Sequence, residues 1–356
     1  MRYAETGFNL EVDLSRGSIE RVETDPRDTE LYLGGLGTNA KILWDRVPPE
    51  IEPFSPDNLL IFSAGLLCGT PAMGCNRTIV STISPQTRLM AFSMMGGFWA
   101  PELKYAGYDK VILRGKSPDL VYLWIKDDKV EIRDASHLKG KGTFETEELI
   151  RQELEEPRAQ VASIGLAGEN RVYFASIQEG KASLSRGGIG AVMGDKGVKA
   201  IAVRGTGDVN IARPAEFMGL CNEVIEYTNH RLKNPIDKGV PSTILATLGI
   251  QEMAISDEKW HVSMFAWGHA RYRRKDYYTR EIHEEWNKTQ EKRVERLISC
   301  YNCPVKCGGL VSHPELAGRY MLKCSQHIRY IVAAKTDNLN FGFKMACLLY
   351  TSPSPR

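Results

Sequence analysis

Three cysteines lie close together in the last third of this 356-residue chain. Cys300, Cys303 and Cys307 follow the spacing C-x2-C-x3-C, and Pro304 and Gly308 favour a compact turn around them. Thiolates crowded in this way are the usual ligands of an iron–sulfur cluster or a zinc ion. A disulfide with one spare thiol is the structural alternative. Because a cubane cluster requires a fourth ligand, the run by itself predicts an incomplete metal site.

The overall composition is that of a soluble globular protein, with 42% apolar and 25% charged residues. The formal net charge of +2 gives no reason to expect nucleic acid as a partner. The most apolar stretch, Leu59–Gly69, is too short to span a bilayer, so we expect no transmembrane segment. Eight cysteines without a secretion signal indicate a reducing, cytoplasmic environment, in which clustered thiols bind metal.

Residues 1–210 predict a sheet-rich domain of an α+β fold. Phe8–Val12 alternates apolar and polar side chains, and the pattern resumes at Ile19–Val22 after a turn, which indicates a hairpin. Helices are expected near Gly37–Asp45 and at Thr143–Glu155, with Thr143 as the N-cap. Further strands are expected at Leu59–Phe62, Thr78–Ile83, Lys110–Leu113, Leu120–Ile125, Val130–Ile132, Gln160–Ile164, Arg171–Ile177 and Lys199–Val203.

The sequence changes character after about residue 210. Helix-like composition predicts a partial, mainly helical domain over residues 211–346, which contains the cysteine run. Residues 347–356 do not continue the preceding pattern and are expected to be a disordered or non-native tail, which suggests that the natural chain was cut near residue 346. The helices of this region are expected at Pro214–Tyr227, Ser242–Leu248, Tyr278–Leu297 and Lys323–Ala334.

Three glycine-bearing loops fall within the sheet-rich domain. They are Gly69–Arg77, Met94–Asp109, which contains Gly96 and Gly97, and Ser185–Lys196. Glycines allow backbone N–H groups to approach an anion closely, and a neighbouring arginine makes an anionic ligand more favourable still. The last loop lacks the Gly-Lys-Ser/Thr ending of a Walker loop, and it lacks the strand–GxGxxG–helix context of a dinucleotide site. The loops are therefore either parts of one cradle for a large phosphorylated cofactor or unrelated tight turns.

Taken in order along the chain, these motifs resemble the aldehyde ferredoxin oxidoreductase family. The resemblance runs from about residue 5 to 345 and implies a tungsten (or molybdenum) ion held by two pterins beside a [4Fe–4S] cluster. It also implies an N-terminal β-sheet base that carries the pterins. The motifs that carry it are Gly34–Gly37, Ala64-Gly65 with Gly69-Thr70, Gly96–Asp109, Ser163–Asn170, Arg186–Gly194 and the C-x2-C-x3-C run.

The resemblance assigns roles to individual residues. Arg77 matches the arginine between cluster and pterins, a role suited to a fixed cation. Met94 stands where an aldehyde-oxidising member carries an asparagine. The pterin-contacting positions are Gly96 with Gly97 and Arg186 with Gly187 and Gly188. The three cluster cysteines are Cys300, Cys303 and Cys307, and the family's fourth cluster cysteine lies farther downstream than this chain extends.

Cys324 distinguishes subfamilies. Aldehyde-oxidising members carry an acidic stretch at this place, whereas a cysteine resembles the tungsten-binding subunit of class II benzoyl-coenzyme A reductases, in which a thiolate binds the metal. Its alternatives are a buried structural thiol or the fourth cluster ligand. Glu252 and His261 resemble the acid–base pair of that subunit. Considered without the resemblance, the alternatives are a surface glutamate and a hydrogen-bonded histidine.

The resemblance thus implies a low-potential oxidoreductase that reduces the aromatic ring of an aryl-coenzyme A thioester. Iron–sulfur subunits or ferredoxin would supply the electrons in a hetero-oligomer. An aldehyde:ferredoxin oxidoreductase is the alternative within the family. A non-catalytic binding module stabilised by metal is the alternative outside it. Metal analysis separates the enzyme from the module, and substrate tests separate the two enzymes.

Overall fold

The computed structural model describes residues 2–180, 182–233, 294–303 and 308–323, together with residues 338, 341 and 344. The chain divides into two compact units. The first contains Met1–Cys221 and also Cys300–Asn302, and the second contains Asn222–Ser299 and residues 303–352. The first part of the cysteine run therefore packs within the N-terminal unit.

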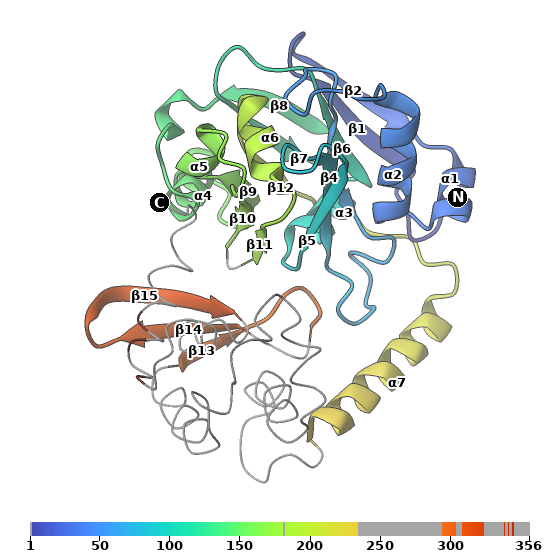
Figure 1. Cartoon of the computed structure of the whole chain (residues 1–356). Coiled ribbons are helices and arrows are strands. Elements are labelled where there is room, and N and C mark those ends of the chain that lie inside the picture. The colour runs from blue at the N-terminus through green and yellow to red at the C-terminus, as the bar shows by residue number, and fades with distance from the viewer. Residues whose placement is uncertain are drawn as a thin grey trace, which may run out of the picture. The chain divides into compact units, whose positions relative to one another are not determined.

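The N-terminal unit is built on two six-stranded mixed sheets (Figure 1). The first sheet has the strand order β2-β1-β6-β3-β4-β5, and β1 and β6 are its parallel neighbours. The hairpin expected at the N-terminus is confirmed as the pair β1–β2. The strands are β1 (Phe8–Asp13), β2 (Ser18–Glu23), β3 (Leu60–Ala64), β4 (Thr78–Ile83), β5 (Met90–Met95) and β6 (Lys110–Arg114).

The second sheet has the order β11-β10-β9-β12-β7-β8. The strands expected at Leu120–Ile125 and Val130–Ile132 pair as the hairpin β7–β8, with its turn at Asp127-Asp128. The strands are β7 (Val121–Lys126), β8 (Lys129–Asp134), β9 (Gln160–Ile164), β10 (Ile177–Glu179), β11 (Ala182–Leu184) and β12 (Val198–Arg204).

Helix α2 (Gly35–Arg46) covers the outer face of the first sheet and α4 (Thr143–Glu153) that of the second, whereas α3 (Trp99–Tyr105) and α6 (Ile189–Asp195) pack into the core between the sheets. Alternate residues of β3 and β6 explain the layering, because Phe62 and Val111 enter the core shared by the sheets, whereas Ile61 and Ile112 pack under α2. Tyr122 and Trp124 of β7 pack on the opposite side with Ile150 of α4. The helices are α1 (Pro26–Tyr32), α2 (Gly35–Arg46), α3 (Trp99–Tyr105), the 3-10 turn η1 (Ser136–Leu138), α4 (Thr143–Glu153), α5 (Leu166–Glu169), α6 (Ile189–Asp195) and α7 (Pro214–Lys233).

Several boundaries differ from the sequence-based expectation. Thr143 is the first residue of α4 and Gly142 is its N-cap, so the N-cap assignment is wrong by one residue. The strand expected at Arg171–Ile177 begins only at Ile177, because Arg171 has a positive φ of 55° and the following residues form turns. Within the described residues, no helix is long and apolar enough to cross a membrane.

The second unit contains a three-stranded antiparallel sheet in the order β13-β14-β15. These strands are β13 (Val294–Ile298), β14 (Gly308–His313) and β15 (Leu316–Lys323). The helix expected at Tyr278–Leu297 is wrong over residues 294–297, which belong to β13. The helix expected at Ser242–Leu248 lies outside the described residues, as does Lys323–Ala334 beyond its first residue.

Lys196 gives the N-terminal unit a testable pH dependence. Its side chain is 1% exposed, and its ammonium donates to the carbonyl of Gly115 at 3.1 Å. Burial lowers the pKa of Lys196 from 10.5 to about 8. Between these values the unfolded chain binds more protons than the folded chain, so the free energy of unfolding should rise with pH, by about 3 kcal/mol in total.

Urea unfolding at several pH values between about 7.5 and 10.5 measures this slope. The matched variant is Lys196→Met, whose unbranched side chain is one atom shorter and cannot titrate. Its free energy of unfolding should rise less over the same interval than that of the wild type. Equal pH dependence in the two proteins would show that Lys196 is not the titrating group.

Candidate functional site

The turn that begins the cysteine run is held by two glycine loops of the N-terminal unit. The Tyr301 N–H donates to the Gly97 carbonyl at 3.1 Å, and the Gly74 N–H donates to the Asn302 carbonyl at 2.9 Å. The Asn76 amide donates to the Tyr301 carbonyl at 2.7 Å. These bonds join segments more than two hundred residues apart in sequence, since Asn76 and Tyr301 are separated by 225 positions.

Gly96 lies directly against the thiol of Cys300. A Cβ built on Gly96 would lie 2.8 Å from Cys300 Sγ, 3.0 Å from Asn76 Oδ1 and 3.6 Å from Arg77 Nη1. Any side chain here would fill the space over the thiol. The structure therefore brings together three residues predicted separately from the sequence, Arg77, Gly96 and Cys300.

Gly97 continues this turn in a conformation that glycine alone adopts readily. Its φ is 152°, and an added Cβ would lie 2.0 Å from Glu179 Oε2. The next two backbone N–H groups, of Phe98 and Trp99, donate to Glu179 Oε1 at 2.7 and 3.1 Å. Glu179 was not predicted from the sequence. Asn76 and Tyr301 had an indirect signal, because each adjoins a predicted site residue.

Gly96 and Gly97 directly follow strand β5. The loop with Arg186, Gly187 and Gly188 lies against the beginning of this strand. A Cβ on Gly187 would lie 2.7 Å from Ala91 Cβ, and one on Gly188 would lie 2.7 Å from Pro85 Cγ. Both glycines have positive φ values, 70° and 66°. Arg186 is exposed. Two groups of predicted residues thus lie toward the two ends of β5, about 17 Å apart at the rise of an antiparallel strand.

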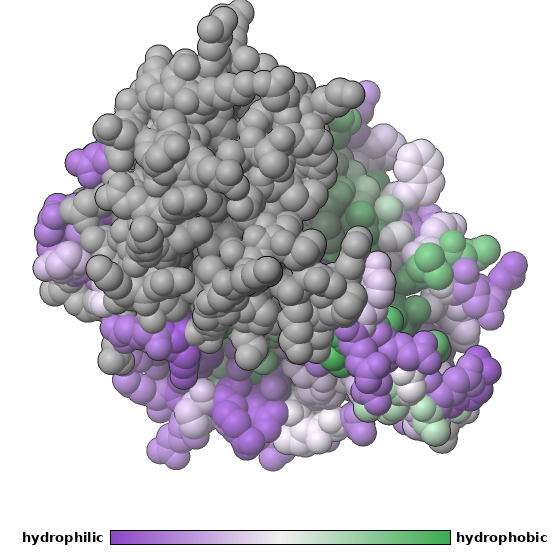
Figure 2. All heavy atoms as spheres, turned by 90° about the horizontal axis from the view of Figure 1, so that it is seen from below, coloured by the Kyte–Doolittle hydropathy of each residue, from purple (hydrophilic) through white to green (hydrophobic). Residues whose placement is uncertain are grey.

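β5 presents an exposed apolar face between these two groups. It is an edge strand, and its alternate residues Met90, Phe92 and Met94 are 39%, 43% and 48% exposed. Phe98 in the following loop is also exposed. Hydrophobic patches are visible on the side of the molecule shown in Figure 2. An edge strand with exposed apolar side chains and a glycine loop toward each end suits a long, flat ligand.

The remaining predicted ligands are less completely described. The cysteine run is the connection between β13 and β14, whose last pair is Ile298–Gly308. Cys303 is half-buried, and the five described cysteines are thiols. Among the described residues, no group of three histidine, cysteine or acidic side chains is close enough to hold a metal. Cys307, Cys324, Glu252 and His261 lie outside the described residues.

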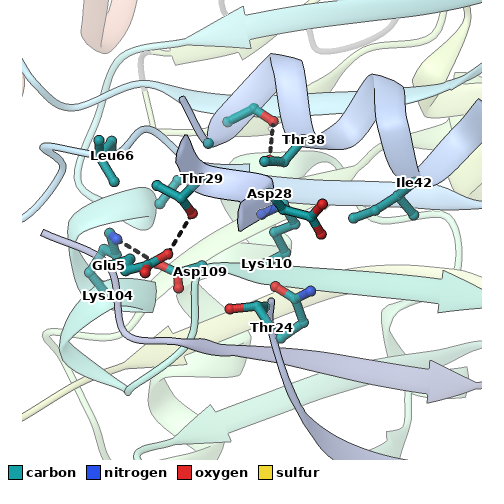
Figure 3. A pocket seen from close by; sticks show the side chains of 14 residues that line it. Glu5, Thr24, Asp28, Thr29, Thr38, Ile42, Leu66, Lys104, Asp109 and Lys110 are labelled. Carbon is teal, nitrogen blue, oxygen red and sulfur yellow. Dashed lines mark hydrogen bonds and ion pairs between the residues drawn. The ribbon is translucent and has the colours of Figure 1, made fainter. Parts of the chain in front are cut away.

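A separate polar cavity of about 30 Å³ lies under α1 and α2, on the outer face of the first sheet (Figure 3). Asn9 and Lys110 are register partners on β1 and β6, and both line it. Lys104 is paired with Asp109 at its edge. The volume accommodates about two water molecules. None of the predicted site residues lines this cavity.

Comparison with known proteins identifies the family. The model for the aldehyde ferredoxin oxidoreductase N-terminal domain matches residues 9–205. The tungsten-containing aldehyde ferredoxin oxidoreductase of Pyrococcus furiosus is 37% identical over 307 residues, which are 86% of this chain and 49% of that protein. The chain therefore belongs to the aldehyde ferredoxin oxidoreductase family, which confirms the resemblance inferred from the motifs.

Two other relatives differ in what they act on. The aliphatic sulfonate oxidoreductase, WOR-like subunit, of Pyrococcus furiosus is 35% identical over 222 residues, covering 58% of this chain and 35% of that protein. A solved structure described as the active site complex BamBC of benzoyl coenzyme A reductase with 1,5 dienoyl-CoA is 66% identical, with a TM-score of 0.85. The matched region covers 99% of the present chain and 53% of the chain in that solved structure. The chain spans about half the length of the relatives it matches.

Proposed function

We propose that this chain is the metallopterin-binding part of an oxidoreductase that reduces the aromatic ring of benzoyl-coenzyme A or a related aryl-coenzyme A thioester. The observation that carries the proposal is the 66% identity over 99% of the chain to a benzoyl coenzyme A reductase complex. The aldehyde-oxidising relative is only 37% identical. Met94, in place of the asparagine of aldehyde-oxidising members, supports the same choice.

The described residues fit the implied cofactors. Cys300 and Cys303, together with Cys307, which lies outside the described residues, would hold a [4Fe–4S] cluster, and Gly96 packs against the buried Cys300 thiol without a side chain. Arg77 and Arg186 are both exposed cations beside the glycine turns, where they can neutralise phosphate. The tungsten bis-pterin and the cluster would supply low-potential electron transfer. The protein's part is to orient both groups and to keep water away from them.

Cys324 is the proposed protein ligand of tungsten. β15 ends at Lys323, and Lys323 pairs with Gly308, so the residue before Cys324 lies beside the residue after Cys307. The proposal for Cys324 itself rests on the resemblance to the tungsten-binding subunit, since this residue lies outside the described residues. Glu252 and His261 are the proposed proton donors, because ring reduction adds a pair of protons together with an electron pair. Iron–sulfur subunits or ferredoxin would deliver the electrons in a cytoplasmic hetero-oligomer.

An anaerobic assay of the holoenzyme tests the reaction. The enzyme receives benzoyl-coenzyme A with a low-potential reductant, or an aldehyde with an oxidising redox dye, and tungsten, iron and zinc are measured in the same sample. We expect a dienoyl-coenzyme A product, together with tungsten and iron. Aldehyde oxidation without ring reduction would establish the alternative enzyme. Zinc alone would establish a non-catalytic module.

Replacement of Cys324 tests the metal ligand separately. In the Cys324→Ala holoenzyme we expect ring reduction to be lost, because the metal loses one of its sulfur ligands. The cluster should keep its iron. A variant with the full ring-reducing activity of the wild type would show that Cys324 is not the tungsten ligand.

A further inference from the structure

Glu179 is a buried carboxylate that joins the second sheet to a loop of the first. It is the last residue of β10 and is 5% exposed. Its Oε1 accepts hydrogen bonds from the N–H groups of Phe98 and Trp99. A carboxylate so far from water normally requires such donors, so these bonds fix both the side chain and the start of α3.

The same carboxylate also packs on the backbone of Gly97. The separation of 2.0 Å between Glu179 Oε2 and a Cβ built on Gly97 shows that the carboxylate occupies the place of a side chain. Gly97 in turn accepts the hydrogen bond of the Tyr301 N–H through its carbonyl, and Gly96 touches the Cys300 thiol. Glu179 therefore acts on the thiol through a single turn of backbone.

We propose that Glu179 is a positioning residue, which holds the Gly96-Gly97 turn against Cys300 and thereby sets the geometry and reduction potential of the bound cluster. The inference rests on the proposed function, since it requires Cys300 to be a cluster ligand. Hydrogen bonds, net charge and solvent exposure around the cysteine sulfurs set the potential of an iron–sulfur cluster. Glu179 controls the hydrogen bonds through the turn and contributes to the net charge through its carboxylate.

A structural role alone predicts a different outcome from a positioning role. If Glu179 only caps α3, its loss lowers the stability of the fold and leaves the electronic properties of the cluster unchanged. If it positions the turn, the electron paramagnetic resonance spectrum and the midpoint potential change in protein that remains folded. These two measurements do not depend on catalytic activity.

Two substitutions separate position from charge. Glu179→Gln keeps an oxygen acceptor for Phe98 and Trp99 but removes the negative charge. Glu179→Ala removes both. In each anaerobically purified variant holoenzyme, we expect the cluster to be reduced more easily than in the wild type. The ratio of reduced to oxidised cluster at a fixed potential should rise about tenfold, which corresponds to a midpoint potential about 59 mV higher for a one-electron couple. The Gln variant should keep the wild-type spectrum, and the Ala variant should have a changed one.

Glu147→Ala provides the matched control. Glu147 lies in α4, is 9% exposed, accepts from the Gly180 N–H at 3.1 Å and pairs with Arg151 at 2.7 Å. It is thus a similarly buried glutamate, and the backbone group that it binds follows Glu179 directly. We expect Glu147→Ala to lower stability without changing the spectrum or the potential.

The outcomes are distinguishable. A wild-type holoenzyme that contains no iron–sulfur cluster contradicts the proposed function. If the wild type contains a cluster and Glu179→Ala has the same spectrum and potential, the positioning role is wrong while the proposed function stands. If the Ala variant does not fold, Glu179→Asp decides, because its shorter side chain keeps the carboxylate but withdraws it from the N–H groups of Phe98 and Trp99. An unchanged spectrum and midpoint potential in Glu179→Asp overturn the proposal.

Discussion

Replacing Cys300 with serine is expected to remove most of the iron bound by the holoenzyme. Cys300 is 8% exposed and its thiol lies against Gly96. A serine hydroxyl at this place is a harder and weaker ligand for the cluster iron than a thiolate. Loss of a residue that only supports a metal ligand typically costs 10–100-fold in affinity. Loss of the ligand itself should therefore cost more than about 100-fold. Iron analysis and the cluster absorbance measure the effect.

Cys68→Ser is the matched control for this experiment. Cys68 is 2% exposed and lies in the same unit, and its thiol donates to the Arg77 carbonyl at 3.6 Å. Burial raises the pKa of Cys68 to about 11, so the side chain stays a thiol at neutral pH and is a poor ligand. The control should keep its iron. Retention of iron in Cys300→Ser, with loss in Cys68→Ser, would reverse the assignment.

The sequence predicted best those elements whose side chains alternate between two buried environments. β4 and β9 have the predicted limits, because both contain β-branched residues and both of their faces are buried. β5 was not predicted as a strand. Its methionines have little β preference, and the apolar side chains of its alternating pattern face outward. β13 was mistaken for helix because its charged sequence gains strand structure only through pairing with β14.

The site was predictable residue by residue but not as an arrangement. The spacing of the cysteines and the glycine motifs, together with the family resemblance, selected Cys300, Gly96 and Arg77. Their proximity depends on hydrogen bonds from the Asn76 loop to the Tyr301 turn, and no local pattern encodes bonds across 225 positions. Glu179 had no signal at all, since a single glutamate at the end of a three-residue strand looks like a surface residue.

The glycine-rich segment after Arg186 also illustrates the limits of a motif. It was interpreted as an anion-binding loop or as a tight turn, and the structure assigns its glycines two different tasks. Gly187 and Gly188 make the turn with positive φ values. Gly190 and Gly194 lie within α6, where a Cβ would collide with the carbonyl oxygens of Ala175 and Gly168, at 2.6 and 1.9 Å. The last two are glycines because of helix packing rather than ligand binding.

Gly194→Ala should consequently destabilise the N-terminal unit by about 3 kcal/mol or more, the upper range for overpacking a core. The colliding atoms are backbone atoms of α5, which cannot move aside like the end of a flexible side chain. Urea unfolding gives the change in free energy.

Gly219→Ala is the control, because Gly219 is exposed in α7 with nothing within 4 Å of an added Cβ. That substitution should stabilise the protein by about 0.5–1 kcal/mol, since alanine is the better helix former. Equal effects of the two substitutions would mean that α5 and α6 do not pack at this distance.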